Sequence, residues 1–180
     1  GLHLFHVKEE RIELMSSTDD VTGIAFNSIK DIYLSKNGIL WVGTNGKGLS
    51  YHHPGSNRFT MFSKKLKSKF KLNFESVRSI YADDDWIFMG GYSGLNRISK
   101  HTGSIDYYKP SVVAYSICEM AGNPDRLIVG TEGDFIYTIE KESGKIQIPP
   151  ALEGYNLGDE IDYMRVVFDI IHLEGNKYLL

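Results

Sequence analysis

The chain alternates short apolar runs with glycine-rich turns along its whole length. The run ILWV at 39–42 is too short for a helix and is rich in strand-forming residues. Residues 43–48 follow with three glycines, which permit the positive φ angles of tight turns. A strand pattern resumes at Leu49, and polar and apolar residues alternate over 58–62 after a second turn. This pattern predicts two successive β-hairpins.

The same pattern returns further along the chain. The triplet WVG at 41–43 recurs as FMG at 88–90 and IVG at 128–130, so the glycines stand 47 and 40 residues apart. A further strand precedes each triplet, and four such upstream strands align: 27–33, 75–81, 112–118 and 165–171. Each unit therefore reads as four short strands joined by turns. That arrangement is typical of a β-propeller blade.

We therefore expect an all-β chain, a partial β-propeller of four-stranded antiparallel blades. The expected parts are a half blade at 1–17, blades at about 24–62, 74–108 and 111–148, and a half blade at 163–180. The predicted core includes six residues: Ile32, Trp41, Ile80, Phe88, Ile117 and Val129.

The two half blades are of different kinds. Gly1 aligns with Gly48, at the start of a third strand, and Leu180 aligns with Val42, at the close of a second strand. We expect a piece of a larger propeller that forms an open arc, with Leu2 and Leu180 far apart. Strand exchange that completes one blade, within or between chains, and a closed four-bladed ring are the alternatives.

The run NSIKDI at 27–32, followed by NGILWVGTNGKGL at 37–49, resembles the two-component regulator propeller repeat. The resemblance is good over 27–62, fair over 75–108 and weaker in the third blade, where Gly133-Asp134-Phe135 replaces the Gly-Leu step. It implies the periplasmic sensor region of a hybrid two-component histidine kinase that detects glycan breakdown products. Kinase activity would then lie elsewhere in the full-length protein.

Composition and charge exclude some other classes. A net charge of −3 argues against a strongly basic nucleic-acid binder, and the single cysteine, Cys118, cannot form an intrachain disulfide. No run of 18 apolar residues occurs, so we expect no membrane contact by this segment. Five lysines within 64–71 would suit an anionic ligand or the protected edge of a sheet.

The sequence offers little support for catalysis, a metal or a cofactor. The three aspartates at 83–85 occupy a turn position, and adjacent His52 and His53 would face opposite sides of a strand. The segment Gly91-Tyr92-Ser93-Gly94 joins strand to strand and lacks the second glycine of a nucleophile elbow. Cys118 aligns with inner-strand tyrosines and is expected to be a buried structural thiol.

The candidate site comes from the first strands, which line the central channel of a propeller. One aligned position holds Lys30, Arg78, Tyr115 and Phe168, whereas an isoleucine stands two residues later in each strand. Tyr92, Asn45 and Lys47 lie on turns that would form a rim around the same channel. Aromatic and polar tips of this kind suit an oligosaccharide. The alternative is that they only pack between blades and cap the channel.

The predicted function is therefore non-catalytic signal input by the periplasmic part of an inner-membrane protein. Its expected partners are an oligosaccharide, the other blades and domains of the full-length receptor, and a second copy in a homodimer. A propeller lyase is one alternative, for which only Lys30 and Arg78 hint at a basic centre. A plain protein-interaction platform is the other.

Overall fold

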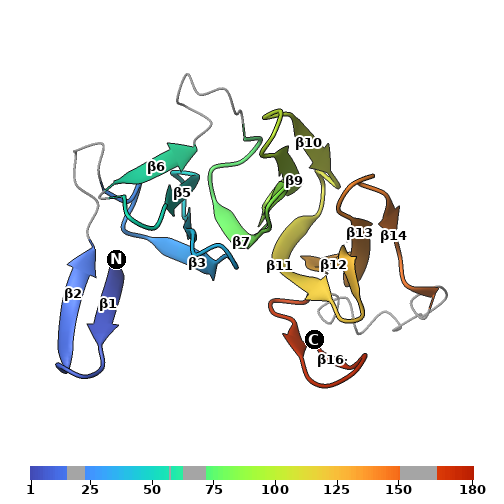
Figure 1. Cartoon of the computed structure of the whole chain (residues 1–180). Coiled ribbons are helices and arrows are strands. Elements are labelled where there is room, and N and C mark those ends of the chain that lie inside the picture. The colour runs from blue at the N-terminus through green and yellow to red at the C-terminus, as the bar shows by residue number, and fades with distance from the viewer. Residues whose placement is uncertain (16–22, 57, 63–71, 151–165) are drawn as a thin grey trace. The chain divides into compact units, whose positions relative to one another are not determined.

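The computed structural model describes residues 1–15, 23–56, 58–62, 72–150 and 166–180, and its elements are all β-strands (Figure 1). Within each sheet, neighbouring strands are also neighbours in sequence. The expected all-β architecture of four-stranded sheets is confirmed.

Among the described residues, three sheets have four strands each, and one two-stranded hairpin precedes them and another follows them along the chain. The N-terminal hairpin is β1 (Leu2–His6) with β2 (Arg11–Met15). The first full sheet is β3 (Ile29–Leu34), β4 (Leu40–Thr44), β5 (Leu49–His52) and β6 (Phe59–Phe62). The second is β7 (Val77–Ala82), β8 (Trp86–Gly91), β9 (Gly94–Ser99) and β10 (Ile105–Tyr108). The third is β11 (Val113–Met120), β12 (Asn123–Glu132), β13 (Ile136–Glu140) and β14 (Ile146–Gln147). The C-terminal hairpin is β15 (Ile171–His172) with β16 (Tyr178–Leu179).

The chain divides into two compact units, and each is described by itself. Unit 1 comprises Gly1–Met89 and Asn96–Asp106, and unit 2 comprises Gly90–Leu95 and Tyr107–Leu180. Leu2 and Leu180 belong to different units, so the open arc stays a prediction.

A glycine in the second strand lets the next blade approach closely, and this contact repeats in both units. A Cβ atom on Gly43 of β4 would lie 2.9 Å from the carbonyl oxygen of Val77 on β7. In unit 2, a Cβ atom on Gly130 of β12 would lie 2.9 Å from the carbonyl oxygen of Val167. Real Cβ atoms do not come so close, so only glycine fits at either position. The matching contacts agree with the alignment of the first strands.

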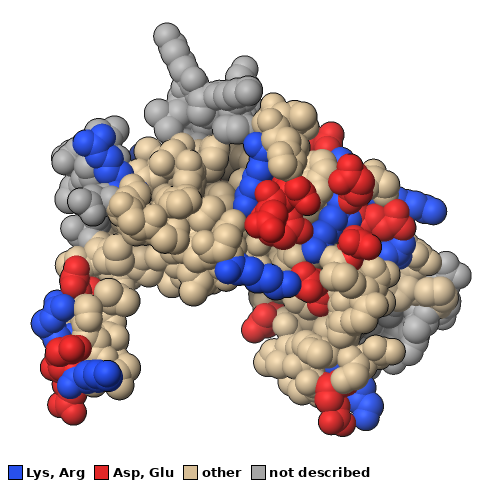
Figure 2. All heavy atoms as spheres, in the orientation of Figure 1, with Lys and Arg blue, Asp and Glu red and all other residues tan. Residues whose placement is uncertain are grey.

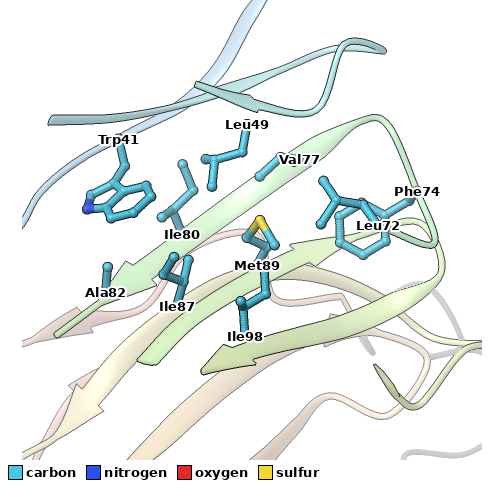
Figure 3. Close-up of a cluster of buried hydrophobic side chains, with 10 residues drawn as sticks. All are labelled: Trp41, Leu49, Leu72, Phe74, Val77, Ile80, Ala82, Ile87, Met89 and Ile98. Atoms are coloured by element: carbon cyan, nitrogen blue, oxygen red, sulfur yellow. The ribbon is translucent and has the colours of Figure 1, made fainter. Parts of the chain in front are cut away.

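The core of unit 1 lies between its two neighbouring blades (Figure 3). Trp41 from β4 packs in one cluster with Ile80 and Ala82 from β7, and the rings of Tyr33 and Tyr81 lie 5.7 Å apart. Burial of Trp41, Ile80, Phe88 and Val129 is confirmed.

The prediction that Ile32 is buried is wrong. Its side chain is 51% exposed, although the equivalent Ile80 on β7 is only 3% exposed. Ile80 is covered by the first two strands of the preceding blade, through Trp41 and its neighbours. The hairpin β1–β2 that precedes β3 corresponds to the third and fourth strands of a blade, and among the described residues no first and second strand of a preceding blade pack on Ile32. Ile117 also differs from the prediction, because it is only half-buried.

Candidate functional site

Bulges in the first strands set the side chains of two predicted site residues apart from the regular ladder. The pairing of β3 with β4 shifts between Ile29 and Asp31, which leaves Lys30 in the irregular step. The pairing of β11 with β12 shifts between Ala114 and Ser116, so Tyr115 is the unpaired residue of a similar irregularity in β11. A bulge redirects the side chain of its extra residue and is often found beside functional sites.

In unit 1, Asn45 connects the starts of two first strands. Its backbone nitrogen donates to the Ser28 carbonyl at 2.8 Å, and its side-chain oxygen accepts from the Ser76 hydroxyl at 3.0 Å. Lys30 and Arg78 each stand two residues after one of these serines. Lys30 is exposed and Arg78 is half-buried. We call Lys30, Asn45 and Arg78 the basic cluster.

Unit 2 contains an aromatic counterpart. The rings of Tyr115 and Phe168 lie 4.8 Å apart at an interplanar angle of 54°. The Tyr115 hydroxyl donates to a carboxylate oxygen of Glu132 at 2.8 Å, and the Phe168 side chain is 69% exposed. Glu132 also forms an isolated β-bridge with Val166, two residues before Phe168. We call Tyr115, Glu132 and Phe168 the aromatic cluster.

The two clusters share one structural plan. Each combines a bulge residue of a first strand, a residue on the following second-to-third-strand turn, and the first strand of the next blade. Asn45 bridges to Ser76 as Glu132 bridges to Val166, so asparagine and glutamate hold equivalent positions. Our sequence reasoning missed Glu132. Its position two residues after Gly130, like that of Asn45 after Gly43, was a signal that could have found it.

A threonine fixes the turn that presents each cluster. In unit 1 the Thr44 hydroxyl donates to the Gly48 carbonyl at 2.8 Å and accepts from the Lys47 backbone nitrogen at 3.2 Å. In unit 2 Thr131 makes the same two contacts, with the Phe135 carbonyl at 3.3 Å and the Asp134 backbone nitrogen at 3.2 Å. Both turns are therefore held by hydrogen bonds at their base, which favours a defined position for the cluster residues above them.

The structure brings some of the predicted site residues together. Tyr115 and Phe168 are in ring contact, and Asn45 and Lys47 lie on one turn, where Lys47 is exposed. Tyr92 is exposed on the turn between β8 and β9, at the position that corresponds to Asn45 and Glu132. The clusters belong to different units, so their convergence on a common channel stays a prediction.

The acidic turn between β7 and β8 is stabilised internally. A side-chain oxygen of Asp83 accepts from the backbone nitrogens of Asp85 and Trp86, at 3.1 and 2.9 Å, and Asp85 pairs with His101 at 2.7 Å. Within the described ranges, no group of three or more His, Cys, Asp or Glu side chains is arranged to hold a metal ion. The lysine run at 64–71 lies outside the described residues.

Cys118 is half-buried on β11, and its environment disfavours the thiolate. Burial, with the nearby Asp169 and Glu119 carboxylates, raises the pKa of the Cys118 thiol to about 11. A thiolate nucleophile at neutral pH would need the opposite shift. Among the described residues, no helix has the length and apolar character needed to cross a membrane.

Comparison with known proteins agrees with the propeller fold. Residues 23–46, which contain Lys30 and Asn45, match the family model described as two component regulator propeller. No curated protein sequence matches the chain.

Solved structures share the fold at low sequence identity. One is the extracellular domain of BT4673 from B. thetaiotaomicron, whose description assigns it to a hybrid two-component system, with a TM-score of 0.72 and 18% identity over 99% of this chain and 23% of that one. Another is the corresponding domain of BT3049 from the same organism, with a TM-score of 0.70 and 18% identity over 82% of this chain and 20% of that one. The computationally designed Ika4 protein matches with a TM-score of 0.52 and 12% identity, over 90% of this chain and 88% of that one.

This chain spans less than a quarter of the length of the two B. thetaiotaomicron domains that it matches. It has a β-propeller fold similar to theirs, and its residues 23–46 match the two-component regulator propeller family.

Proposed function

We propose that this chain is part of the ligand-sensing input region of a hybrid two-component regulator, and that its ligand is an oligosaccharide. The aromatic cluster is the observation that carries the proposal. Phe168 offers a largely exposed ring beside Tyr115, and Glu132 lies within hydrogen-bond distance of the same tyrosine. The apolar face of a sugar ring stacks on aromatic side chains, and its hydroxyl groups donate to carboxylates.

The basic cluster complements this chemistry. Lys30 and Arg78 supply cations, and Asn45 supplies an amide, on the same structural plan as the aromatic cluster. Together with Lys47 and Tyr92 they would contact ring oxygens, hydroxyl groups or acidic substituents of a glycan. A ligand that contacts several first strands would couple its binding to the arrangement of the blades.

In this proposal the chain has no catalytic role and acts in the periplasm, as part of a protein anchored in the inner membrane. Binding would shift the population of receptor conformations, and a histidine kinase elsewhere in the full-length protein would respond to that shift. Other blades and domains of the receptor, and a second receptor in a homodimer, would transmit it.

The proposal is tested by measuring how a panel of neutral and acidic oligosaccharides shifts the melting temperature of the protein. A ligand present at a hundredfold excess over its Kd stabilises the folded state by about 2.7 kcal/mol. We expect Phe168→Ala and Arg78→Ala to remove the shift. Phe168 is exposed, so its truncation should leave the fold intact.

Tyr107→Ala is the matched control, because Tyr107 is an exposed aromatic residue of β10 outside both clusters. It should retain the full shift. A shift that survives both Phe168→Ala and Arg78→Ala would place the site elsewhere, and the absence of any shift across the panel would contradict an oligosaccharide ligand.

A further inference from the structure

The aromatic cluster carries a negative charge that no basic side chain among the described residues balances. Glu132 accepts a hydrogen bond from the neutral Tyr115 hydroxyl at 2.8 Å, and no Lys, Arg or His of the described ranges pairs with it. Asp169, the residue after Phe168, is exposed and likewise has no basic partner in those ranges. The hydrogen bond from Tyr115 thus fixes the Glu132 carboxylate beside the rings and leaves its charge uncompensated.

Other carboxylates of unit 2 do have basic partners. These ion pairs are Lys109–Asp134, Lys141–Glu119 and Arg126–Glu140. Figure 2 shows the same pattern over β13 and β14, where acidic and basic side chains lie next to one another. Glu132 departs from this pattern, and it does so within the cluster to which we assign ligand binding.

The rings beside Glu132 favour positive charge as well. The rings of Tyr115 and Phe168 lie 4.8 Å apart and are inclined to one another at 54°. The Phe168 side chain is 69% exposed, so a ligand can reach it. The face of an aromatic ring attracts an ammonium group that lies within about 6 Å of its centre. A cationic group here would therefore gain from the rings and from the carboxylate together.

The chain leaves open space next to Glu132. The following residue is Gly133, whose φ is 106°. A Cβ atom added to Gly133 would meet no atom of the described residues within 4 Å. The turn therefore leaves room for a ligand group to approach the Glu132 carboxylate.

The equivalent residues of unit 1 have the opposite chemistry. The basic cluster has Lys30, Arg78 and Asn45 at the positions that Tyr115, Phe168 and Glu132 occupy in the aromatic cluster. Two cations and a neutral amide thus correspond to two rings and a carboxylate. The same backbone plan carries side chains suited to different ligand groups, and the aromatic cluster is the one suited to a cation.

We propose that the aromatic cluster selects an amino sugar with a free, protonated amine over a neutral sugar. The apolar face of the sugar ring stacks on Phe168, and its ammonium group donates to Glu132 beside the Tyr115 ring. This inference rests on the proposed oligosaccharide-sensing function and specifies which class of sugar the aromatic cluster takes.

Three β-1,4-linked tetrasaccharides that differ only in the group on carbon 2 test the inference. They consist of glucosamine, N-acetylglucosamine or glucose units, and so carry an ammonium, an acetamide or a hydroxyl group at mildly acidic pH. Their affinities for the protein are measured by isothermal titration calorimetry. We expect the glucosamine tetrasaccharide to bind about tenfold more tightly than the other two, through the ring contact and the ion pair together.

Glu132→Gln removes the charge and keeps an oxygen that can accept from Tyr115. It should reduce the preference for the amine to about threefold, because the contact with the rings remains. The double variant Glu132→Gln/Phe168→Leu should abolish the preference. Glu142→Gln is the matched control, because it removes one negative charge from an exposed turn between β13 and β14, outside both clusters. It should retain the full preference, and circular dichroism checks that each variant is folded.

Two results would overturn the inference and leave oligosaccharide sensing intact. One is equal affinity for the three tetrasaccharides, and the other is a preference that Glu132→Gln leaves unchanged. Methylammonium chloride carries the charge without the sugar, and binding as tight as that of the glucosamine tetrasaccharide would also overturn the inference.

The failure of this inference can be distinguished from the failure of the proposed function. If another oligosaccharide of the panel bound and none of these three did, only the selection of an amino sugar would be wrong. If no oligosaccharide bound at all, the proposed function and this inference would both be wrong.

Discussion

In the first two blades, a polar side chain of the third strand hydrogen-bonds to the segment that leads into the blade. The Ser50 hydroxyl accepts from the Ala25 backbone nitrogen at 3.0 Å, and the Asn96 side chain accepts from the Asn73 backbone nitrogen at 3.3 Å. In the third blade the aligned lead-in residue is Pro110, which has no N–H to donate.

The aligned third-strand residue of that blade is Tyr137. Its hydroxyl is buried and has no hydrogen-bond partner among the described residues, and burial, with the nearby Asp134, raises its pKa. The third blade thus has a buried hydroxyl but lacks the backbone N–H that would donate to it. A buried hydroxyl without a partner lowers the free energy of unfolding.

Tyr137→Phe should therefore stabilise the protein, by about 1 kcal/mol, because it removes a buried hydroxyl without a partner and keeps the ring. Ser50→Ala, which removes the paired hydroxyl of the first blade, should destabilise it by about 1 kcal/mol. Urea unfolding of both variants measures the two changes in the free energy of unfolding. A loss of stability in Tyr137→Phe as large as that in Ser50→Ala would contradict the assignment.

The pKa of Cys118 leads to a second prediction at this scale. Since burial raises the pKa of the Cys118 thiol from its ordinary 9.0 to about 11, the unfolded chain loses this proton first as pH rises. Between those two values the folded state binds more protons, so the thiol lowers stability as pH increases. Below pH 9 both states keep the proton and the contribution is constant.

We therefore expect slow alkylation of Cys118 by iodoacetamide at pH 8 in the folded protein and fast alkylation in denaturant. Cys118→Ala should show a smaller loss of unfolding free energy between pH 9 and pH 11 than the parent chain. Equal alkylation rates with and without denaturant would refute a protected thiol.

At the scale of the element, the turn between the second and third strands has the same hydrogen bonds in the first and third blades, although its sequence differs. Gly48 and Phe135 close the equivalent turns of the first and third blades with φ angles of 76° and 63°. The phenylalanine adopts a conformation that costs an L-residue about 1–2 kcal/mol. It nevertheless packs against the buried cluster of Ile128, Val167 and Ile170, which offsets that cost. Our alignment identified the departure at Phe135, but the preserved turn became visible only through its hydrogen bonds.

Gly94 begins β9, and this position requires glycine for two reasons that can be tested separately. Its φ is 84°, and a Cβ atom there would overlap the carbonyl oxygens of Tyr108 and Lys109, at 2.0 and 2.3 Å. Gly55 has a similar φ of 79° with no atom within 4 Å of an added Cβ. Gly55→Ala should cost only the conformational term, about 1 kcal/mol.

Gly94→Ala should cost several-fold more, because backbone atoms of Tyr108 and Lys109 must also move. Chemical denaturation of both variants, with circular dichroism as the signal, measures the difference. If the two variants lost similar amounts of unfolding free energy, the close approach of the backbone to Gly94 would add little to the cost of the substitution.

At the scale of the whole molecule, the sequence predicted the order of strands and sheets because the repeat is local. Each hairpin is specified by its own glycines and apolar runs, so alignment of Gly43, Gly90 and Gly130 was sufficient. Burial was less predictable, since it depends on the neighbouring blade: Ile32 and Ile80 have the same local sequence pattern and opposite exposure. The candidate site was predictable only in part. The contact between Tyr115 and Phe168 follows from their aligned positions in neighbouring first strands, whereas the contact with Glu132 became visible only through its hydrogen bond.

The same dependence on neighbours should set the order in which the strands open. Second strands lie between two partners in their sheet, and Val42 on β4 and Val129 on β12 are fully buried. Among the described residues, each strand of the two terminal hairpins pairs with one strand only, and both hairpins carry many exposed apolar side chains. Isolated two-stranded hairpins are only marginally stable in water. Amide protons of β4 and β12 should therefore exchange last, and those of β1, β2, β15 and β16 first.

Hydrogen exchange followed by mass spectrometry measures this order. Uniform exchange along the chain would show that the blades open as one unit, and would contradict a stability determined by each blade's neighbours.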